Sequence, residues 1–539
     1  MRGGSSLPEL MARTAGRTVP RFGCISLTWA IGLVATSLVP SCLPRDPGDL
    51  VPTDELNLPV AVAISAGSNR LYVANSNFDL RFNSGSLLAL DAEEIRARLP
   101  RACEQSSDCE GGRSCGVPSD LEAVQSGVRF CVDDEARACS DRPQTTAERV
   151  ENPGICAPIV LAEPGIVRDA VRTTPFLADM RYALYGPADD RRARLFVTSR
   201  GGGTLIWADV ENDLRDAPGP VLDCGQTTDA RCDSVHAVGD EDSEQTRLGE
   251  VLPVEPNPLA VSTDGTTVAV GHETQGSVSL FTNDEDGVEL ESVLRGLSPN
   301  PASITAVPPP QAANVDESID GAPAFLVSYR QVGVGSVDLL RVTGGDAPFF
   351  LRSDQAFNVS ADTRAIELDD SRRQACELGC DGTSECLIEC TATPLDVFAI
   401  SRSPASLLAG QTRPALATVL SNDVPNFNHT VPLAVAGGPS GLAAGSIIAE
   451  DGSRSLRVFA LAFNIGLLYV YDPALERLES TIQVGRGPQS IALDEEHGLL
   501  YVAQFTDSHI SVVDFDRRRA TYGQVLLSVG RPVRPISGG

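Results

Sequence analysis

The sequence contains no lysine, so all 43 of its basic residues are arginine. Without lysine the chain cannot form a Schiff base with a carbonyl substrate, and it cannot supply the lysine of a Walker-type phosphate loop. Acidic residues outnumber basic ones by 72 to 43, which gives a formal net charge of −29 at pH 7. Because binding to nucleic acid depends on neutralising phosphates, this balance argues against a nucleic-acid partner and favours a soluble, self-repelling surface.

Several patterns that carry chemistry are also absent. The five histidines share no ligand-like spacing, none belongs to a C-x-x-C-H haem motif, and no G-x-S-x-G nucleophile elbow occurs. The acidic stretch Asn283–Gly287 is shorter than an EF-hand loop and lacks its final glutamate. It predicts a solvated turn, with a calcium ion as an unsupported alternative, so no cofactor is predicted.

The N-terminus carries the pattern of an export signal. Arginines at 13, 17 and 21 precede a mostly apolar run of 16 residues, Cys24–Val39, which is too short to span a membrane but fits a signal peptide. Ser41-Cys42 follows and resembles the lipobox of bacterial lipoproteins. The resemblance implies a signal peptide over residues 1–41, lipidation of Cys42, a tether over 42–56 and attachment to a membrane of the bacterial envelope. Leu43 after the cysteine favours the outer membrane, and ordinary secretion is the alternative.

The other cysteines agree with an oxidising compartment. Beyond Cys24 and Cys42 there are twelve, in clusters of six, two and four. Since each cluster is even, we predict six local disulfides. The twelve candidates are Cys103, Cys109, Cys115, Cys131, Cys139, Cys156, Cys224, Cys232, Cys376, Cys380, Cys386 and Cys390. The last cluster shows C-x-x-x-C twice, which on two helices would let disulfides staple an αα-hairpin; zinc is the less favoured alternative, because zinc pairs usually have C-x-x-C spacing.

A strand–turn–strand pattern recurs seven times along the chain. Its clearest copies are "LYVAN" before "SLLALD" near residue 71 and "LYVAQ" before "ISVVD" near residue 500. The seven second strands begin at Leu71, Leu195, Val268, Phe325, Val397, Val458 and Leu500. Four short strands in about forty residues are typical of the blades of a β-propeller. We therefore predict an all-β fold, a β-propeller most consistent with seven blades.

The repeats resemble YVTN-type propeller repeats, in which a DG-like turn is followed by L-Y-V-(A/T)-N and I-S-V-(I/V)-D. The resemblance implies a propeller over residues 57–530 and a C-terminal tail over 531–539. It also leaves three insertions: a Cys-rich segment at 92–170, an acidic loop at 212–250 and the hairpin at 370–392. Aspartates that follow the third strands are expected to accept backbone N–H groups of the next turn. They are Asp91, Asp209, Asp472 and Asp514.

Aligning the repeats brings candidate ligand residues together. The ends of the second strands and the residues after them are expected at the mouth of the central channel. The candidates there are Arg200, His272, Glu273, Tyr329, Arg330, Arg402 and Gln504. Three arginines on an acidic protein could hold an anionic small molecule, or could pair with acidic loops nearby.

Two functions stay open. The first is a non-catalytic envelope lipoprotein whose propeller binds a protein or an anionic small molecule, or serves as a scaffold. The second is a propeller hydrolase or oxidoreductase, lactonase-like, with a metal ion in the channel. Such an enzyme needs several Asp, Glu, Asn or His side chains converging there. The aligned rim is too mixed to show this, so no catalytic or metal-binding residue is predicted.

Overall fold

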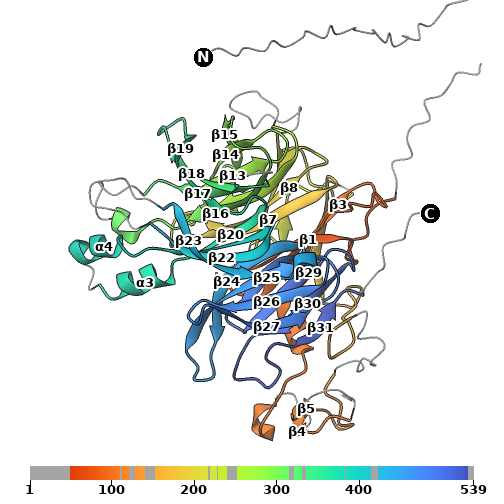
Figure 1. Cartoon of the computed structure of the whole chain (residues 1–539). Coiled ribbons are helices and arrows are strands. Elements are labelled where there is room, and N and C mark those ends of the chain that lie inside the picture. Colours follow the sequence, from red (N-terminus) through yellow and green to blue (C-terminus); the bar gives the residue numbers. More distant parts are fainter. Residues whose placement is uncertain are drawn as a thin grey trace, which may run out of the picture. The chain divides into compact units, whose positions relative to one another are not determined.

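Strand pairing defines a seven-bladed β-propeller, in agreement with the prediction from the repeats (Figure 1). The computed structural model describes residues 49–109, 112–119, 128–139, 152–215, 219–227, 229–239, 252–314, 321–330, 335–380, 383–413 and 423–531. The signal peptide and most of the tether, including Cys42, lie outside these residues. Among the described residues, no helix is both long and apolar enough to span a bilayer.

Each blade is one antiparallel sheet of strands that follow one another along the chain, except that an insertion separates the third and fourth strands of the first blade. The first is β1 (Pro59–Ile64), β2 (Arg70–Asn75), β3 (Gly85–Asp91) and β6 (Val167–Thr173). The second is β7 (Leu177–Tyr185), β8 (Arg192–Ser199), β9 (Thr204–Val210), β10 (Leu222–Asp223) and β11 (Ala237–Val238). The third is β12 (Pro256–Val261), β13 (Thr267–His272), β14 (Ser277–Asn283) and β15 (Val288–Leu294).

The remaining four blades follow the same order. The fourth is β16 (Pro301–Val307), β17 (Ala324–Tyr329), β18 (Gly335–Thr343) and β19 (Phe349–Val359). The fifth is β20 (Thr363–Asp369), β21 (Asp396–Arg402), β22 (Ala405–Thr412) and β23 (Pro425–Pro432). The sixth is β24 (Pro439–Ile448), β25 (Arg454–Ala462), β26 (Leu467–Asp472) and β27 (Arg477–Gln483). The seventh is β28 (Pro488–Asp494), β29 (Leu499–Gln504), β30 (His509–Asp514) and β31 (Val525–Val529).

The apolar interior lies between the blades. The described residues form seven hydrophobic clusters, and each joins the facing sides of two neighbouring sheets. Because the two middle strands of a blade are covered on both faces, their sequences are nearly continuous apolar runs of β-branched, aliphatic and aromatic residues. The innermost strands contact one another around the ring, from β1 through β7, β12, β16, β20 and β24 to β28 and back to β1.

Turn residues set the hairpins. Gly265, in the Asp264-Gly265 turn between β12 and β13, has a φ of +76°, and a Cβ there would clash with the carbonyl oxygen of Leu184. Three of the predicted turn aspartates do accept backbone N–H groups: Asp91 from Glu94, Asp472 from Ala474 and Leu475, and Asp514 from Asp516. Asp209 differs. Its carboxylate accepts from the side chains of Arg194 and Tyr185, because the buried guanidinium of Arg194 lies directly opposite it.

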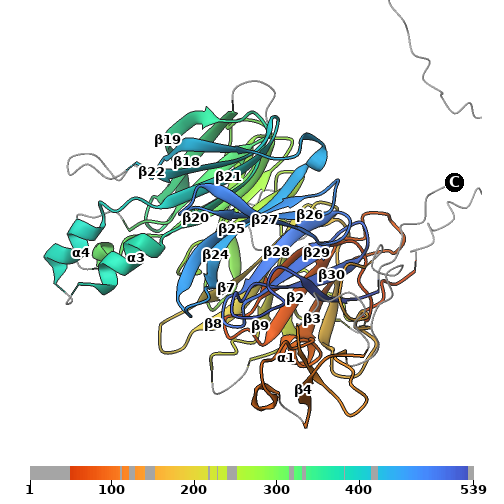
Figure 2. The ribbon, with the colours of Figure 1, turned by 60° about the horizontal axis from the view of Figure 1, so that its bottom comes forward.

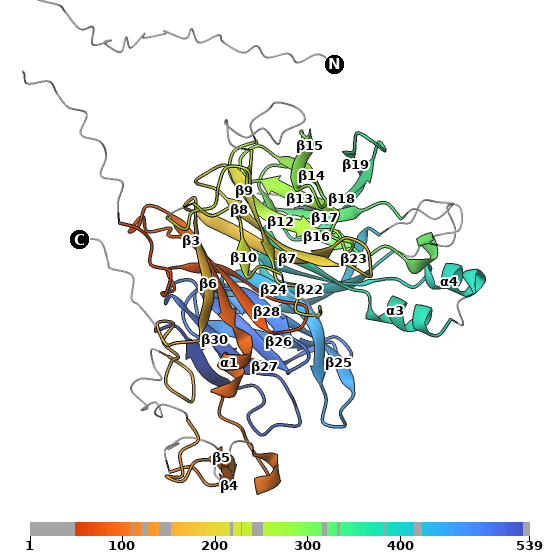
Figure 3. The same cartoon turned by 180° about the vertical axis from the view of Figure 1, so that it is seen from behind.

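The insertions leave the sheets at the ends of strands. The Cys-rich segment between β3 and β6 contains α1 (Ala92–Ala97), η1 (Ser106–Asp108), β4 (Ser114–Gly116) and β5 (Phe130–Val132). Figure 3 shows α1 beside the first blade and the β4–β5 pair beyond it. Between β20 and β21 lie α3 (Ser371–Leu378) and α4 (Ser384–Cys390), which project to one side in Figure 1. Short 3₁₀ turns are η2 (Gln311–Asn314) and η3 (Val435–Gly437).

The ring closes between the first and last blades, which lie side by side in Figure 2. The Leu58 N–H donates to Ser508 Oγ at 3.0 Å, and the Val62 N–H to Ser490 Oγ at 3.2 Å. The Cys-rich insertion adds a second tie, because residues 155–159 pair with β31, the outermost strand of the seventh blade. The insertion therefore belongs to the closure of the ring rather than to a separate module.

Candidate functional site

A cavity of about 630 Å³ occupies the centre of the propeller, within the range typical of small-molecule sites. The first strands of the blades form its wall, and the loops after the second strands form its mouth. All seven residues that directly follow the repeat ends predicted for the second strands line it: Ser76, Arg200, Glu273, Arg330, Arg402, Phe463 and Phe505. The repeat alignment thus leads to one rim.

Three predicted rim residues form a bridged cluster. Glu273 Oε2 lies 3.3 Å from Nη2 of Arg200, and Glu273 Oε1 lies 3.3 Å from Nη1 of Arg330. Asn257 donates to the same carboxylate, and Glu255 lies 3.4 Å from Arg200. The carboxylate of Glu273 is nearly buried, so it neutralises part of the positive charge of both arginines. Arg200 and Arg330 are therefore paired with acidic side chains, which is the alternative to ligand binding given above.

Arg402 has different surroundings. Its Nε donates to the carbonyl oxygen of Pro439 at 2.8 Å, and no carboxylate of the described residues is within salt-bridge distance of its guanidinium. Nearby, Arg364 holds Asp362 through a 2.7 Å contact from Nε to Oδ1. Burial, together with the positive charges of Arg364 and Arg330, holds the pKa of Arg402 below its ordinary value, although the carboxylate of Asp362 opposes the shift. Burial likewise lowers the pKa of Arg364. This part of the rim therefore carries cations that repel one another.

The structure keeps three predicted rim residues away from the cavity. His272, Tyr329 and Gln504 end their second strands and are fully buried between blades. His272 Nε2 lies 2.8 Å from Ser279 Oγ, and burial lowers its pKa to about 3, so the ring is neutral. Tyr329 donates to Asp338 at 2.6 Å. The reason is the alternation of side chains along a strand: the last residue points into the packing, and its successor points toward the mouth.

Deeper in the cavity lie three charged residues that the sequence analysis did not select. Asp179 and Arg181 belong to β7, and Glu367 belongs to β20. Arg181 Nη1 lies 2.8 Å from Asp179 Oδ1, and the Leu259 N–H donates to Asp179 Oδ2 at 3.1 Å. Burial raises the pKa of Glu367 to about 7, with Asp179 adding to the rise and Arg181 opposing it.

Arg181 and Glu367 also line a second cavity of about 440 Å³ near the opposite mouth. They are therefore the charged residues shared by the two chambers of the channel. Glu367 and Arg364 escaped sequence analysis because β20, the first strand of the fifth blade, has no clear turn signal after it. The only available signal was the alternating pattern of "TRAIELD".

The twelve predicted cysteines form six disulfides, each within its cluster. The pairs are Cys103–Cys115, Cys109–Cys131, Cys139–Cys156, Cys224–Cys232, Cys376–Cys390 and Cys380–Cys386. The last two join α3 to α4 and the turn between them. Among the described residues, the groups of three or more Cys, His, Asp or Glu close enough to share an ion consist of these bonded cysteines. In the stretch Asn283–Gly287, Asp284 accepts the backbone N–H groups of Asp286 and Gly287, as in an ordinary turn.

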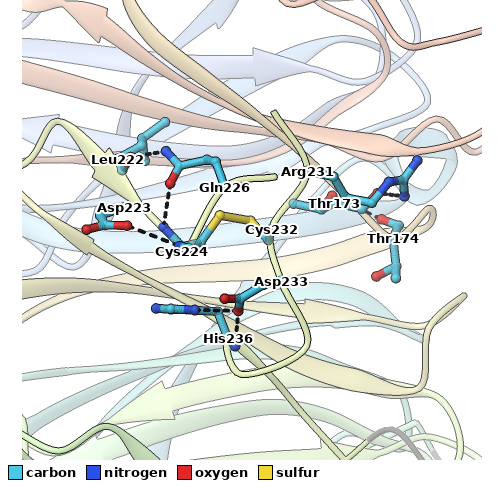
Figure 4. The surroundings of a disulfide bond; sticks show 11 residues. Thr173, Thr174, Leu222, Asp223, Cys224, Gln226, Arg231, Cys232, Asp233 and His236 are labelled. Carbon is cyan, nitrogen blue, oxygen red and sulfur yellow. Dashed lines mark hydrogen bonds and ion pairs between the residues drawn. A yellow bond between two sulfur atoms is a disulfide. The ribbon is translucent and has the colours of Figure 1, made fainter. Parts of the chain in front are cut away.

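The Cys224–Cys232 disulfide closes a loop of the second blade that also contacts the first blade (Figure 4). The Cys232 N–H donates to the carbonyl oxygen of Arg172 at 2.9 Å, and the Arg172 N–H donates to Ala230 at 2.7 Å. The loop of the second blade thus pairs with β6, the outermost strand of the first. His236 Nδ1 lies 2.7 Å from Asp233 Oδ1 beside the bridge, which fixes the turn that follows.

No model of a known protein family matches the chain, and no curated protein matches its sequence. Among solved structures, the chain is similar to the β-propeller domain of Cps50 (Swd1) from Myceliophteria thermophila. The two are 10% identical over 86% of this chain and 98% of that one, with a TM-score of 0.43. Hydrazine synthase of Kuenenia stuttgartiensis is 12% identical over 87% of this chain and 98% of its own, with a TM-score of 0.40. Sqt1 of Saccharomyces cerevisiae is 11% identical over 62% and 73%, with a TM-score of 0.37.

Similarity at this level says nothing about activity. The propeller is established by strand pairing, and the YVTN-type repeat remains a resemblance of sequence.

Proposed function

We propose that this protein is a non-catalytic binding protein of the bacterial envelope, which holds a small molecule in its central cavity. The observation that carries the proposal is the convergence of seven equivalent loop positions on one cavity with an arginine, Arg402, that is not paired with a carboxylate among the described residues. A guanidinium offers two parallel N–H donors to a carboxylate, sulfonate or phosphate oxygen pair. An anionic group on the ligand would supply the negative charge that this part of the rim lacks.

The cavity function is tested by blocking the cavity. Ala302, on the first strand of the fourth blade, lines the wall, so Ala302→Trp fills the space without removing a charge. We expect compounds from a panel of organic acids, sugar phosphates and neutral aromatics to raise the melting temperature of the full chain. Every such rise should disappear in Ala302→Trp and persist in Leu475→Trp, which alters an exposed residue in the loop after β26. Equal stabilisation of both variants would contradict the proposal.

The attachment to the envelope is a second part of the proposal, supported by the sequence "VPSC" that ends at Cys42. The thiol of Cys42 would carry the lipid, and the chain up to residue 56 would connect it to the propeller. Incorporation of labelled palmitate in a bacterial host is expected for the unaltered chain and to be lost in Cys42→Ser. Cys24→Ser is the matched control, because Cys24 lies within the leader. Retained labelling of Cys42→Ser would overturn the lipid anchor without touching the cavity.

A further inference from the structure

The mouth of the cavity has an aromatic side. Four phenylalanine rings form a continuous chain of contacts across it: Phe176 to Phe78 at 5.5 Å, Phe78 to Phe505 at 6.2 Å, and Phe505 to Phe463 at 6.2 Å between centroids. Phe176 lies in the connection between the first and second blades, and the other three rings come from loops of the first, seventh and sixth blades, which are neighbours in the ring. All four line the cavity, and Phe78 is 55% exposed. The other three rings are partly buried. The ring surface left open to water is costly, and a bound apolar surface would remove that cost.

Two of these rings are held in place by their backbone. Phe176 has a φ of +60°, a conformation that is strained for a bulky residue. Its N–H donates to the carbonyl oxygen of Ser76 at 2.8 Å, and its carbonyl oxygen accepts the Arg200 N–H at 3.0 Å. Gly201 lies against the ring, where a Cβ would come within 2.7 Å of Phe176 Cδ2. These contacts hold the strained backbone in place and so fix the direction of the Phe176 ring.

Phe78 is set by the residue before it. Asn77 also has a positive φ, +54°, and its side chain accepts the Phe82 N–H at 3.0 Å and donates to the Phe82 carbonyl oxygen. This closes the loop after β2 and leaves Phe78 at its turn, where the ring reaches Phe176 and Phe505. The aromatic side is therefore built by four separate loops, and the backbone is fixed at two of them, those of Phe78 and Phe176.

The opposite side of the mouth is cationic. Arg330, from the fourth blade, and Arg364 and Arg402, from the fifth, line the same cavity. The acidic partners there are Glu273 beside Arg330 and Asp362 beside Arg364. Three guanidinium groups thus face two carboxylates, which leaves one positive charge without an acidic partner among these side chains.

From these two sides we infer that the cavity binds an aromatic organic anion, whose flat apolar body lies on the four phenylalanine rings and whose acidic group meets Arg402. The inference rests on the proposed function and narrows it to a ligand class. The cavity volume accommodates one to a few fused or linked rings with an acidic substituent. A small inorganic anion would leave the rings uncovered, and an uncharged aromatic would leave the charge of Arg402 uncompensated.

A pair of dyes tests this class directly. 8-Anilinonaphthalene-1-sulfonate carries a naphthalene, a phenyl ring and a sulfonate, and N-phenyl-1-naphthylamine is the same body without the charge. Fluorescence titration of the full chain should give one site for the sulfonate, lost in Ala302→Trp. Arg402→Gln should lower the affinity for the sulfonate by about tenfold or more. It should lower the affinity for the neutral dye by less than about twofold. Phe505→Ala should weaken both several-fold, since both use the ring surface.

Controls on the opposite end of the strands separate the site from general dye binding. Arg454→Gln removes an exposed arginine paired with Glu495, and Leu475→Ala removes an exposed apolar side chain. Neither should alter the affinity for either dye. Binding of the neutral dye also reports that Arg402→Gln is folded.

The inference is overturned if Arg402→Gln leaves the sulfonate unaffected, if both dyes bind with equal affinity, or if the controls weaken binding as much as the site variants do. It is also overturned, while the proposed function survives, if neither dye binds the cavity but a compound of another class does and is lost in Ala302→Trp. If Ala302→Trp abolishes the binding of no dye and of no compound in the panel, the proposed function fails together with the inference.

Discussion

The backbone N–H of Ile159 donates to the carbonyl oxygen of Ser528 at 2.8 Å, so that an insertion of the first blade extends the sheet of the last. Three further bonds continue the pairing: the N–H groups of Ile155, Cys156 and Gly530 donate to Val525, Leu526 and Ile159. In this propeller the first and last blades each consist of their own strands. The insertion therefore supplies the strand pairing that joins the two chain ends, and it also covers the free edge of β31.

Removing the Cys139–Cys156 disulfide should weaken this closure. The bond closes a loop of 17 residues and anchors the segment that begins at Ile155. Cys139→Ala combined with Cys156→Ala should lower the free energy of unfolding by about 2–4 kcal/mol. It should also make the segment before β6 more sensitive to limited proteolysis, because the pairing with β31 would open first.

The matched control is the double alanine variant of Cys103 and Cys115, which bridge within the outer part of the same insertion. We expect that variant to leave protease sensitivity near residue 155 unchanged. Equal proteolysis of the two variants at that position would contradict the role assigned to the insertion in closing the ring.

A buried arginine stabilises the contact between the second and third blades. Arg194 has a side chain only 1% exposed, its Nε lies 2.7 Å from Asp209, and it donates across the interface to Asn283 and to the carbonyl oxygen of Asp284. The ring of Trp207 lies 4.2 Å from the guanidinium carbon. Arg194→Ala should lower the free energy of unfolding by about 2–4 kcal/mol, because it removes the hydrogen bonds that the guanidinium makes to the buried side chains of Asn283 and Tyr185.

Arg192, two residues earlier on the same strand, provides the comparison. Its side chain is 42% exposed and it faces Glu285 at 3.6 Å. Arg192→Ala should cost less than about 1 kcal/mol in a urea titration. Similar losses for both variants would show that strand propensity, rather than the buried contacts of Arg194, determines the effect.

The free energy of unfolding should depend on pH through Glu367. Burial raises its pKa from 4.5 to about 7, so the native state disfavours the ionised carboxylate. The stabilisation due to this group is complete below pH 4.5 and is lost as the pH rises through 7. At pH 8, the free energy of unfolding of Glu367→Gln, measured by urea titration, should therefore exceed that of the unaltered chain by about 1–3 kcal/mol. At pH 4.5 the two free energies should be nearly equal.

An exposed residue without a titratable group gives the control. Leu475→Ala, at a residue 57% exposed, should differ from the unaltered chain by the same amount at pH 8 and at pH 4.5. If Glu367→Gln and the unaltered chain differ by the same amount at both pH values, the carboxylate of Glu367 is not held in the native state as the structure implies.

The repeats predict the blades because each middle strand must be apolar on both faces, a demand that leaves a plain trace in the sequence. The same argument locates the rim, since the residue after each second strand turns toward the mouth. The repeat pattern does not distinguish that residue from the one before it. For this reason it predicts His272, Tyr329 and Gln504 at the rim, although the structure buries them between blades. Phe78 and Phe176 escape it as well, because their positions depend on loops of irregular length and on positive φ angles that no periodicity reveals.

The balance of charge at the rim should be adjustable through Glu273. This carboxylate lies 3.3 Å from both Arg200 and Arg330, and it competes with any bound anion for their N–H donors. Glu273→Gln keeps the size of the side chain and removes its charge, so Arg330 loses this carboxylate and Arg200 keeps, among the described residues, only Glu255 as an acidic partner. We expect the affinity for 8-anilinonaphthalene-1-sulfonate to rise several-fold and that for N-phenyl-1-naphthylamine to stay the same. The gain should shrink as salt is added, because the rim is open to solvent. An unchanged or reduced affinity for the sulfonate would mean that Glu273 positions the arginines and does not compete with the anion.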